Sequence, residues 1–124
     1  MRERWLLDSN PLIYLATGRH PGLEAWIGAR DVAISAITRV EVLGYHQLSS
    51  PDEAALTAYL GAADELPLVP EVLDGAIRLR QRRRMSLGDA LIAATALRHA
   101  LALATHNARD FAWIDGLEVV DPLA

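Results

Sequence analysis

Acidic residues occur at points of the chain where a carboxylate is costly to bury. Asp8 ends the apolar run 5–7, Glu41 follows another apolar run, and Asp89 enters the small-residue apolar segment 90–96. Ionised groups are rarely buried without a partner, and neighbouring carboxylates repel unless a cation lies among them. Mg²⁺ or Mn²⁺ prefers such oxygen ligands. If these acids share one cleft, they indicate metal-assisted hydrolysis of a phosphodiester.

Helix capping is the alternative role for two of these acids. Ser86 and Asp89 have the spacing of a capping box, in which the acid also favours the positive end of the helix dipole. Thr38 and Glu41 have the same spacing, which gives Glu41 a capping role if that helix begins late. If Ser35 is the cap instead, Glu41 has no capping role.

Asp8 is followed by residues that themselves signal a helix start. Ser9 or Asn10 can act as the N-cap, with Pro11 at the first helical position. We therefore expect Asp8 to be free of capping and available for chemistry.

Strand and helix patterns alternate along the whole chain, which predicts a three-layer α/β/α domain with a mostly parallel central sheet. Expected strands are 5–7, 32–34, 66–70, 101–105 and 117–120, the third being an edge strand because of its prolines. Expected helices are 11–17, 23–28, 35–48, 53–63, 71–84, 86–101 and 107–111. In the helix 35–48, Val40, Leu43 and Leu48 are assigned to the core.

A parallel sheet gathers functional side chains at one edge. Ligands bind outside the carboxyl ends of its strands, where helices begin. Asp8 and Asn107 follow strands, Glu41 lies a few residues beyond one, and Asp89 is at a helix start. These four residues are therefore expected to face one cleft.

The chain has 124 residues, no cysteine and a net charge of -4. This length predicts a single domain over residues 1–124. The lack of cysteine excludes disulfides and thiolate zinc sites, and no stretch resembles a signal peptide or a membrane span. We expect a cytoplasmic protein. The mild negative charge excludes general coating of nucleic acid, so contacts with a polyanion require a local patch.

Arginines supply one candidate patch. All 12 basic residues are arginine, and one cluster precedes Asp89: Arg78, Arg80, Arg82, Arg83 and Arg84. Guanidinium groups suit bidentate contacts with phosphate, although a solvated helix face explains such a run equally well. Arg39 and Arg109 are weaker candidates for the same contacts.

Taken in order, residues 7–10, 38–41, 87–94 and 105–111 resemble the successive motifs of PIN domains, with VapC-type toxins of toxin–antitoxin pairs as the closest match. The resemblance spans essentially the whole chain. It implies an Mg²⁺- or Mn²⁺-dependent ribonuclease, inhibited by a cognate antitoxin whose C-terminal segment blocks the cleft. A homodimer is also implied.

The resemblance assigns roles to individual residues. Asp8, Glu41 and Asp89 are the implied metal-binding acids, and Asn10 and Thr105 are polar neighbours that orient carboxylates or water.

A fourth acidic position of the family falls on Asn107, which is a departure. An amide oxygen can bind a metal but brings no charge. Asp110 also matches a family acid and either compensates or caps the short helix. Asn107 leaves open a catalytically silent PIN-fold module that binds RNA or protein. Receiver domains and haloacid-dehalogenase-like phosphatases are set aside because the chain lacks lysine.

Apolar residues of the early helices offer a place for the antitoxin. An amphipathic segment would lie in a groove between these helices, although the same residues also fit an ordinary core. The residues concerned are Leu12, Leu15, Leu23, Trp26, Leu56, Tyr59 and Leu60.

Overall fold

A parallel sheet forms the centre of the computed structural model, which describes residues 4–18 and 20–123. Its strands are β1 (Arg4–Leu7), β2 (Asp31–Ser35), β3 (Asp64–Leu66), β4 (Ala102–Ala104) and β5 (Val119–Val120). They lie in the order β3-β2-β1-β4-β5, and every neighbouring pair is parallel. The predicted parallel α/β architecture is confirmed.

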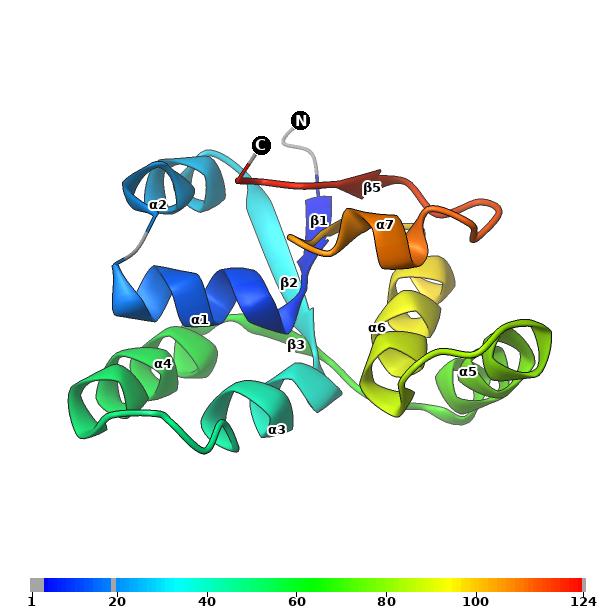
Figure 1. Cartoon of the computed structure of the whole chain (residues 1–124), viewed down its shortest axis with the longest axis horizontal. Helices are drawn as coiled ribbons and strands as arrows, with labels where there is room; N and C mark the ends of the chain where they lie inside the picture. Colours follow the sequence, from blue (N-terminus) through cyan, green and yellow to red (C-terminus); the bar gives the residue numbers. More distant parts are fainter. Residues whose placement is uncertain (1–3, 19, 124) are drawn as a thin grey trace.

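Helices cover both faces of this sheet. In chain order they are α1 (Ser9–Thr17), α2 (Pro21–Gly28), α3 (Ala36–Leu43), α4 (Ser50–Ala62), α5 (Pro70–Arg82), α6 (Leu87–Arg98) and α7 (Ala108–Phe111). Figure 1 shows α1 to α4 on one side of the strands and α5 and α6 on the other. The three predicted layers are therefore present.

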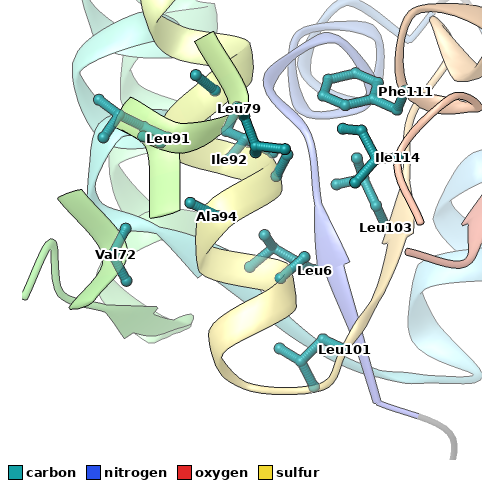
Figure 2. Packing of buried hydrophobic residues seen from close by; sticks show 14 of the residues in the cluster. Leu6, Val72, Leu79, Leu91, Ile92, Ala94, Leu101, Leu103, Phe111 and Ile114 are labelled. Carbon is teal, nitrogen blue, oxygen red and sulfur yellow. The ribbon is translucent and has the colours of Figure 1, made fainter. Parts of the chain in front are cut away.

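Successive side chains of a strand point to opposite faces of the sheet, so the core is divided between these two faces. Leu6 and Leu103 pack with α5, α6 and the segment around α7, whereas Leu7 and Ala104 pack with α1 to α4. Figure 2 shows Leu6, Ile92 and Leu103 among the side chains of the first of these clusters, with Leu103 near Ile114. Since β1 is buried on both faces, it has the continuous apolar sequence of a central parallel strand.

Helix α6 lies deepest of the helices because its side chains are small. All of its residues from Ala90 to Ala96 are buried. A Cβ placed on Gly75 of α5 would lie 3.3 Å from the Cβ of Ala94, so α5 and α6 approach closely at this point. Small residues thus allow one helix to pack against both the sheet and its neighbour.

Most predicted elements differ from the structure by a few residues at their ends, and helix 35–48 and strand 66–70 differ most. Helix 35–48 ends at Leu43, because Gly44 takes the C-cap, and Val40 is 66% exposed, so its assignment to the core was wrong. The expected strand 66–70 is replaced by β3 at Asp64–Leu66, which is an edge strand as predicted. Proline lacks the N–H that a strand needs, and Pro70 instead begins α5.

Within the ranges given above, no helix is both long and apolar enough to cross a bilayer.

Candidate active site

The carboxyl ends of β1 and β4 meet at the point where the strand order reverses. The chain passes from β1 to β2 on one side, while β4 and β5 lie on the other. The Asp8 N–H donates to the carbonyl of Ala104 at 2.9 Å, which brings the residues after both strands together. Such a reversal is where α/β sheets bind ligands.

Asp8 is the most buried acid at this edge. Its residue is 4% exposed, and its carboxylate accepts the Thr105 hydroxyl at 2.6 Å and the Ser9 N–H at 2.7 Å. Burial raises the pKa of Asp8, these two hydrogen bonds oppose that rise, and the charge of Glu41 adds to it. The carboxylate is therefore held in a fixed orientation in an environment that disfavours its charge.

The expectation that Asp8 takes no part in capping was wrong. Helix α1 begins at Ser9, so Asp8 occupies the N-cap and its carboxylate accepts the N–H of the next residue. Neither Ser9 nor Asn10 is the cap. The helix N-terminus contributes a favourable field to the same carboxylate that chemistry would use.

Ser9 connects two of the predicted acids, a role that was not foreseen. Its N–H binds Asp8, and its hydroxyl donates to Glu41 at 2.7 Å. Glu41 also lies against Gly88, where an added Cβ would overlap Oε2 of Glu41. The sequence offered Ser9 only as a capping residue, and contact between α1 and α3 carries no local signal.

Asp89 enters the site from the first turn of α6. Its N–H donates to Ser86 at 3.1 Å, so the predicted cap by Ser86 is confirmed. Its carboxyl is half-buried, and burial followed by the charge of Asp8 raises its pKa, with a smaller rise from Asp110 and an opposing hydrogen bond from Ser86. The negative charge of Asp8 therefore disfavours ionisation of Asp89.

Ser35, not Thr38, begins α3. It occupies the N-cap position, although its hydroxyl makes no capping bond and lies 3.1 Å from that of Thr95. The proposed capping box of Thr38 and Glu41 is therefore wrong, and Glu41 is left for its contact with Ser9.

The remaining predicted polar residues differ in what they contribute. Thr105 accepts the N–H of Asn107 at 3.0 Å while donating to Asp8, so it links both residues. The Asn107 side chain itself is exposed and makes no capping bond to α7. Asn10 is half-buried in α1, and Asp110 is exposed but near enough to affect Asp89.

The donors present suit a hard cation. Across the described chain, no three acidic or histidine side chains converge closely enough to hold a metal ion together. Mg²⁺ does not require this, because it is commonly bound by one or two carboxylates and keeps several waters. Asp8 and Asp89 provide such a pair, whose mutual repulsion a cation would relieve. The full set of Asp8, Glu41 and Asp89 stays a prediction.

The clustered arginines separate into groups. Arg83 and Arg84 line a cavity of about 380 Å³ that also contains Asp89. Arg78 lines a different cavity, and Arg80 donates to the carbonyl of Met85 at 3.3 Å. Arg82 also lines the cavity of Arg78. Only part of the cluster therefore lies beside the acids.

Arg39, a weaker phosphate candidate, forms an ion pair with Glu65 at 2.9 Å.

An apolar cavity of about 430 Å³ lies between α1, α2 and α4. Leu15, Leu56 and Tyr59 line it, with Glu24 at its edge. The other residues proposed for this groove belong to or adjoin the core: Leu12, Leu23 and Leu60 are buried, and the half-buried Trp26 packs against them.

Comparisons with known proteins identify the family and the fold of the chain. The PIN domain family model matches residues 5–117. A chain of a toxin–antitoxin complex from Klebsiella pneumoniae is 35% identical with a TM-score of 0.77, over 95% of this chain and 97% of that one. FitAcB from Neisseria gonorrhoeae contains a chain 25% identical with a TM-score of 0.72, over 94% and 96%. DNA-bound VapBC from Salmonella typhimurium contains a chain 20% identical with a TM-score of 0.83, over 98% and 99%, which bears on the fold alone. The search of curated proteins finds no match.

Replacing Asp89 by asparagine is expected to stabilise the metal-free protein at neutral pH. The folded-state pKa values of Asp8 and Asp89 are raised, so stability is lost as pH rises from the ordinary value of 3.8 through the raised values. Asp89→Asn should raise Tm by a few degrees at pH 7 in EDTA, since about 1 kcal/mol shifts the Tm of such a domain by roughly 4 °C. The gain should vanish near pH 4.

Thermal unfolding at both pH values measures this effect. Asp74→Asn, on the exposed surface of α5, is the control and should leave Tm unchanged. A lower Tm for Asp89→Asn than for the wild type at pH 7 would contradict the proposed repulsion between Asp8 and Asp89.

Proposed function

The chain belongs to the PIN-domain family, and from this premise we propose that it is an Mg²⁺- or Mn²⁺-dependent endoribonuclease, the toxin of a VapBC-type pair. One observation carries the proposal: Asp8 is buried, fixed by Thr105 and Ser9, and close enough to Asp89 to raise its pKa. An RNA substrate and a co-produced antitoxin would place its action in the cytoplasm.

The residues of the site have separate tasks in this reaction. A divalent ion held there would activate water and stabilise charge on the phosphate oxygens. Asp8 and Asp89 would hold that ion, with Glu41 as the third acid. Thr105 and Ser9 fix the carboxylate of Asp8, because outer hydrogen bonds orient metal ligands. Asn107 and Asp110 would complete the polar rim, and Asn10 would orient water.

A silent binding module is the alternative. The exposed amide of Asn107 replaces an acid and adds no charge to the site. The buried and hydrogen-bonded Asp8 favours catalysis, because a module without catalysis has no use for a carboxylate held at this cost.

The antitoxin is proposed to occupy the apolar cavity between α1, α2 and α4. The relative from Klebsiella pneumoniae is a chain of a toxin–antitoxin complex. Leu15 and Tyr59 are partly exposed in this cavity, which suits the apolar face of an amphipathic segment.

Two copies of the chain are proposed to associate through α5 and α6. Leu73, Ile77 and Leu87 are 43%, 55% and 57% exposed. They line one cavity of about 940 Å³. Contiguous exposed apolar side chains mark interaction surfaces.

Loss of Asp8 or Asp89 should abolish RNA cleavage. With Mn²⁺ and labelled single-stranded and transfer RNAs, Asp8→Asn and Asp89→Asn should reduce the rate to that seen in EDTA. Thr105→Val keeps the shape but loses the hydrogen bond to Asp8, and should cost about 10- to 100-fold in rate.

Exposed residues provide the matched controls for these rates. Asp74→Asn and Thr57→Val should cleave like the wild type. If the wild type binds Mn²⁺ and RNA but cuts neither substrate class, the binding module replaces the nuclease. Equal cleavage by Asp89→Asn and wild type would identify a contaminant.

A charge in the apolar cavity should prevent neutralisation by the antitoxin. Ala55 lines this cavity and is exposed, so Ala55→Glu should weaken binding of the protein encoded by the neighbouring gene while RNA cleavage is retained. Ala54→Glu, beside it on α4 but outside the cavity, is the control. Co-expression and calorimetry measure the effect, and equal affinity of both variants would exclude this groove.

A charge on α5 should separate the proposed dimer. Ile77→Glu is expected to give a monomer by light scattering, because it places a charge within the apolar contact. Val40→Glu changes a residue on α3 that is more exposed, 66% against 55% for Ile77, and should leave the mass unchanged. A monomeric wild type, or a dimeric Ile77→Glu variant, would reject this surface.

A further inference from the structure

The cavity beside Asp89 is formed by the loop before α6 and by the segment around α7. Its volume of about 380 Å³ lies within the range of small-ligand sites, which begins near 300 Å³. Arg83, Arg84 and Arg109 line it together with Asp89, Asp110 and Trp113. Positive groups thus adjoin the acid that completes the site.

The arginines of this cavity have no carboxylate partner within residues 4–18 and 20–123. Among the residues that the structure describes, Arg83, Arg84 and Arg109 form no ion pair, although Arg4 and Arg39 do. A chain with a net charge of -4 offers many acids. The guanidinium groups of Arg84 and Arg109 therefore remain available for bidentate contact with phosphate.

Trp113 provides a flat surface in the same cavity. Its indole N–H donates to the carbonyl of Asp110 at 3.1 Å, and the half-buried ring packs against the core around α6. The guanidinium carbon of Arg83 lies 5.4 Å from the ring centroid. This hydrogen bond fixes the ring relative to Asp110. The charge of Asp110 in turn raises the pKa of Asp89, so the ring lies near the acidic site. A nucleobase stacks favourably on such a ring.

We propose that this cavity binds the nucleotide next to the scissile phosphate. Arg84 and Arg109 contact its phosphate, and its base stacks on the surface formed by Trp113 and Arg83. This inference rests on the proposed function, since it supplies the position of the RNA strand relative to Asp89. Binding one nucleotide firmly at this point would set which bond enters the acidic site.

RNA fits this cavity better than an acidic peptide does. Both carry negative charge for the arginines, and both would meet Asp89 and Asp110 in the lining of the cavity. Only the nucleotide adds a planar group that matches the indole, so it gains a contact that a carboxylate side chain lacks. The peptide is kept as an outcome of the test.

Binding is measured on Asp8→Asn, in which RNA cleavage is expected to be abolished. Fluorescence anisotropy with a labelled eight-nucleotide single strand gives Kd at several salt concentrations. Arg84→Gln and Arg109→Gln should each weaken binding and each reduce the slope of log Kd against log salt by about 0.7. Arg78→Gln, from the same arginine cluster but lining another cavity, is the matched control.

The base contact has its own pair of variants. Trp113→Leu should weaken binding about tenfold, and Trp113→Phe should restore most of it because a ring is retained. An oligonucleotide that lacks the bases should bind Trp113→Leu and the parent equally. Circular dichroism and Tm establish that each variant is folded.

The outcomes separate this inference from the proposed function. If the wild type cleaves RNA with a metal but Arg84→Gln and Arg109→Gln bind RNA with unchanged affinity, the nuclease is kept and the nucleotide-binding role of this cavity is rejected. Arginine-dependent RNA binding without cleavage by the wild type would reject the nuclease and overturn the placement next to a scissile phosphate, leaving the cavity as an RNA-binding site only. Loss of antitoxin affinity alone in Arg84→Gln and Arg109→Gln would assign the cavity to a protein partner and overturn the inference.

Discussion

The hydrogen bond from Thr105 to Asp8 determines how the rest of the acidic edge is built. A carboxylate at the end of a buried strand loses hydration, and Glu41 and Asp89 add repulsion. The Thr105 hydroxyl and the Ser9 N–H offset part of this cost. Thr105 directly follows β4, and Asp8 directly follows β1. The hydrogen bond between them therefore fixes the carboxylate only while β1 and β4 stay paired. The hydrogen bond between Thr105 and Asp8 therefore affects both the stability of the folded chain and the orientation of the Asp8 carboxylate.

Gly88 imposes a second constraint at this edge. The carboxylate of Glu41 fills the space that a side chain would take, which allows α3 and α6 to present their acids close together. A methyl group there would displace the flexible end of Glu41 without opening the core. This position controls the arrangement of the acids separately from the stability of the fold.

Much of the architecture followed from local patterns. The apolar run 5–7 and the small residues 90–96 predicted a buried strand and a buried helix, and both are present. Contacts between distant elements were harder to predict. The role of Ser9 depends on Glu41, which is 32 residues away, and the exposure of Val40 depends on where Gly44 ends the helix. Helix starts were ambiguous because several capping residues occur in succession, so tertiary packing selected Asp8 at the first helix.

The separation of 97 positions along the chain between Asp8 and Thr105 has a consequence for synthesis. Elongation proceeds at about 5–20 residues per second, so the two ends of this hydrogen bond leave the ribosome roughly 5–20 s apart. During that interval β1 lacks its β4 neighbour, and the Asp8 carboxylate lacks its Thr105 donor. The acidic edge is consequently among the last features of the nascent chain to assemble. The acidic site therefore cannot form until most of the chain has been synthesised.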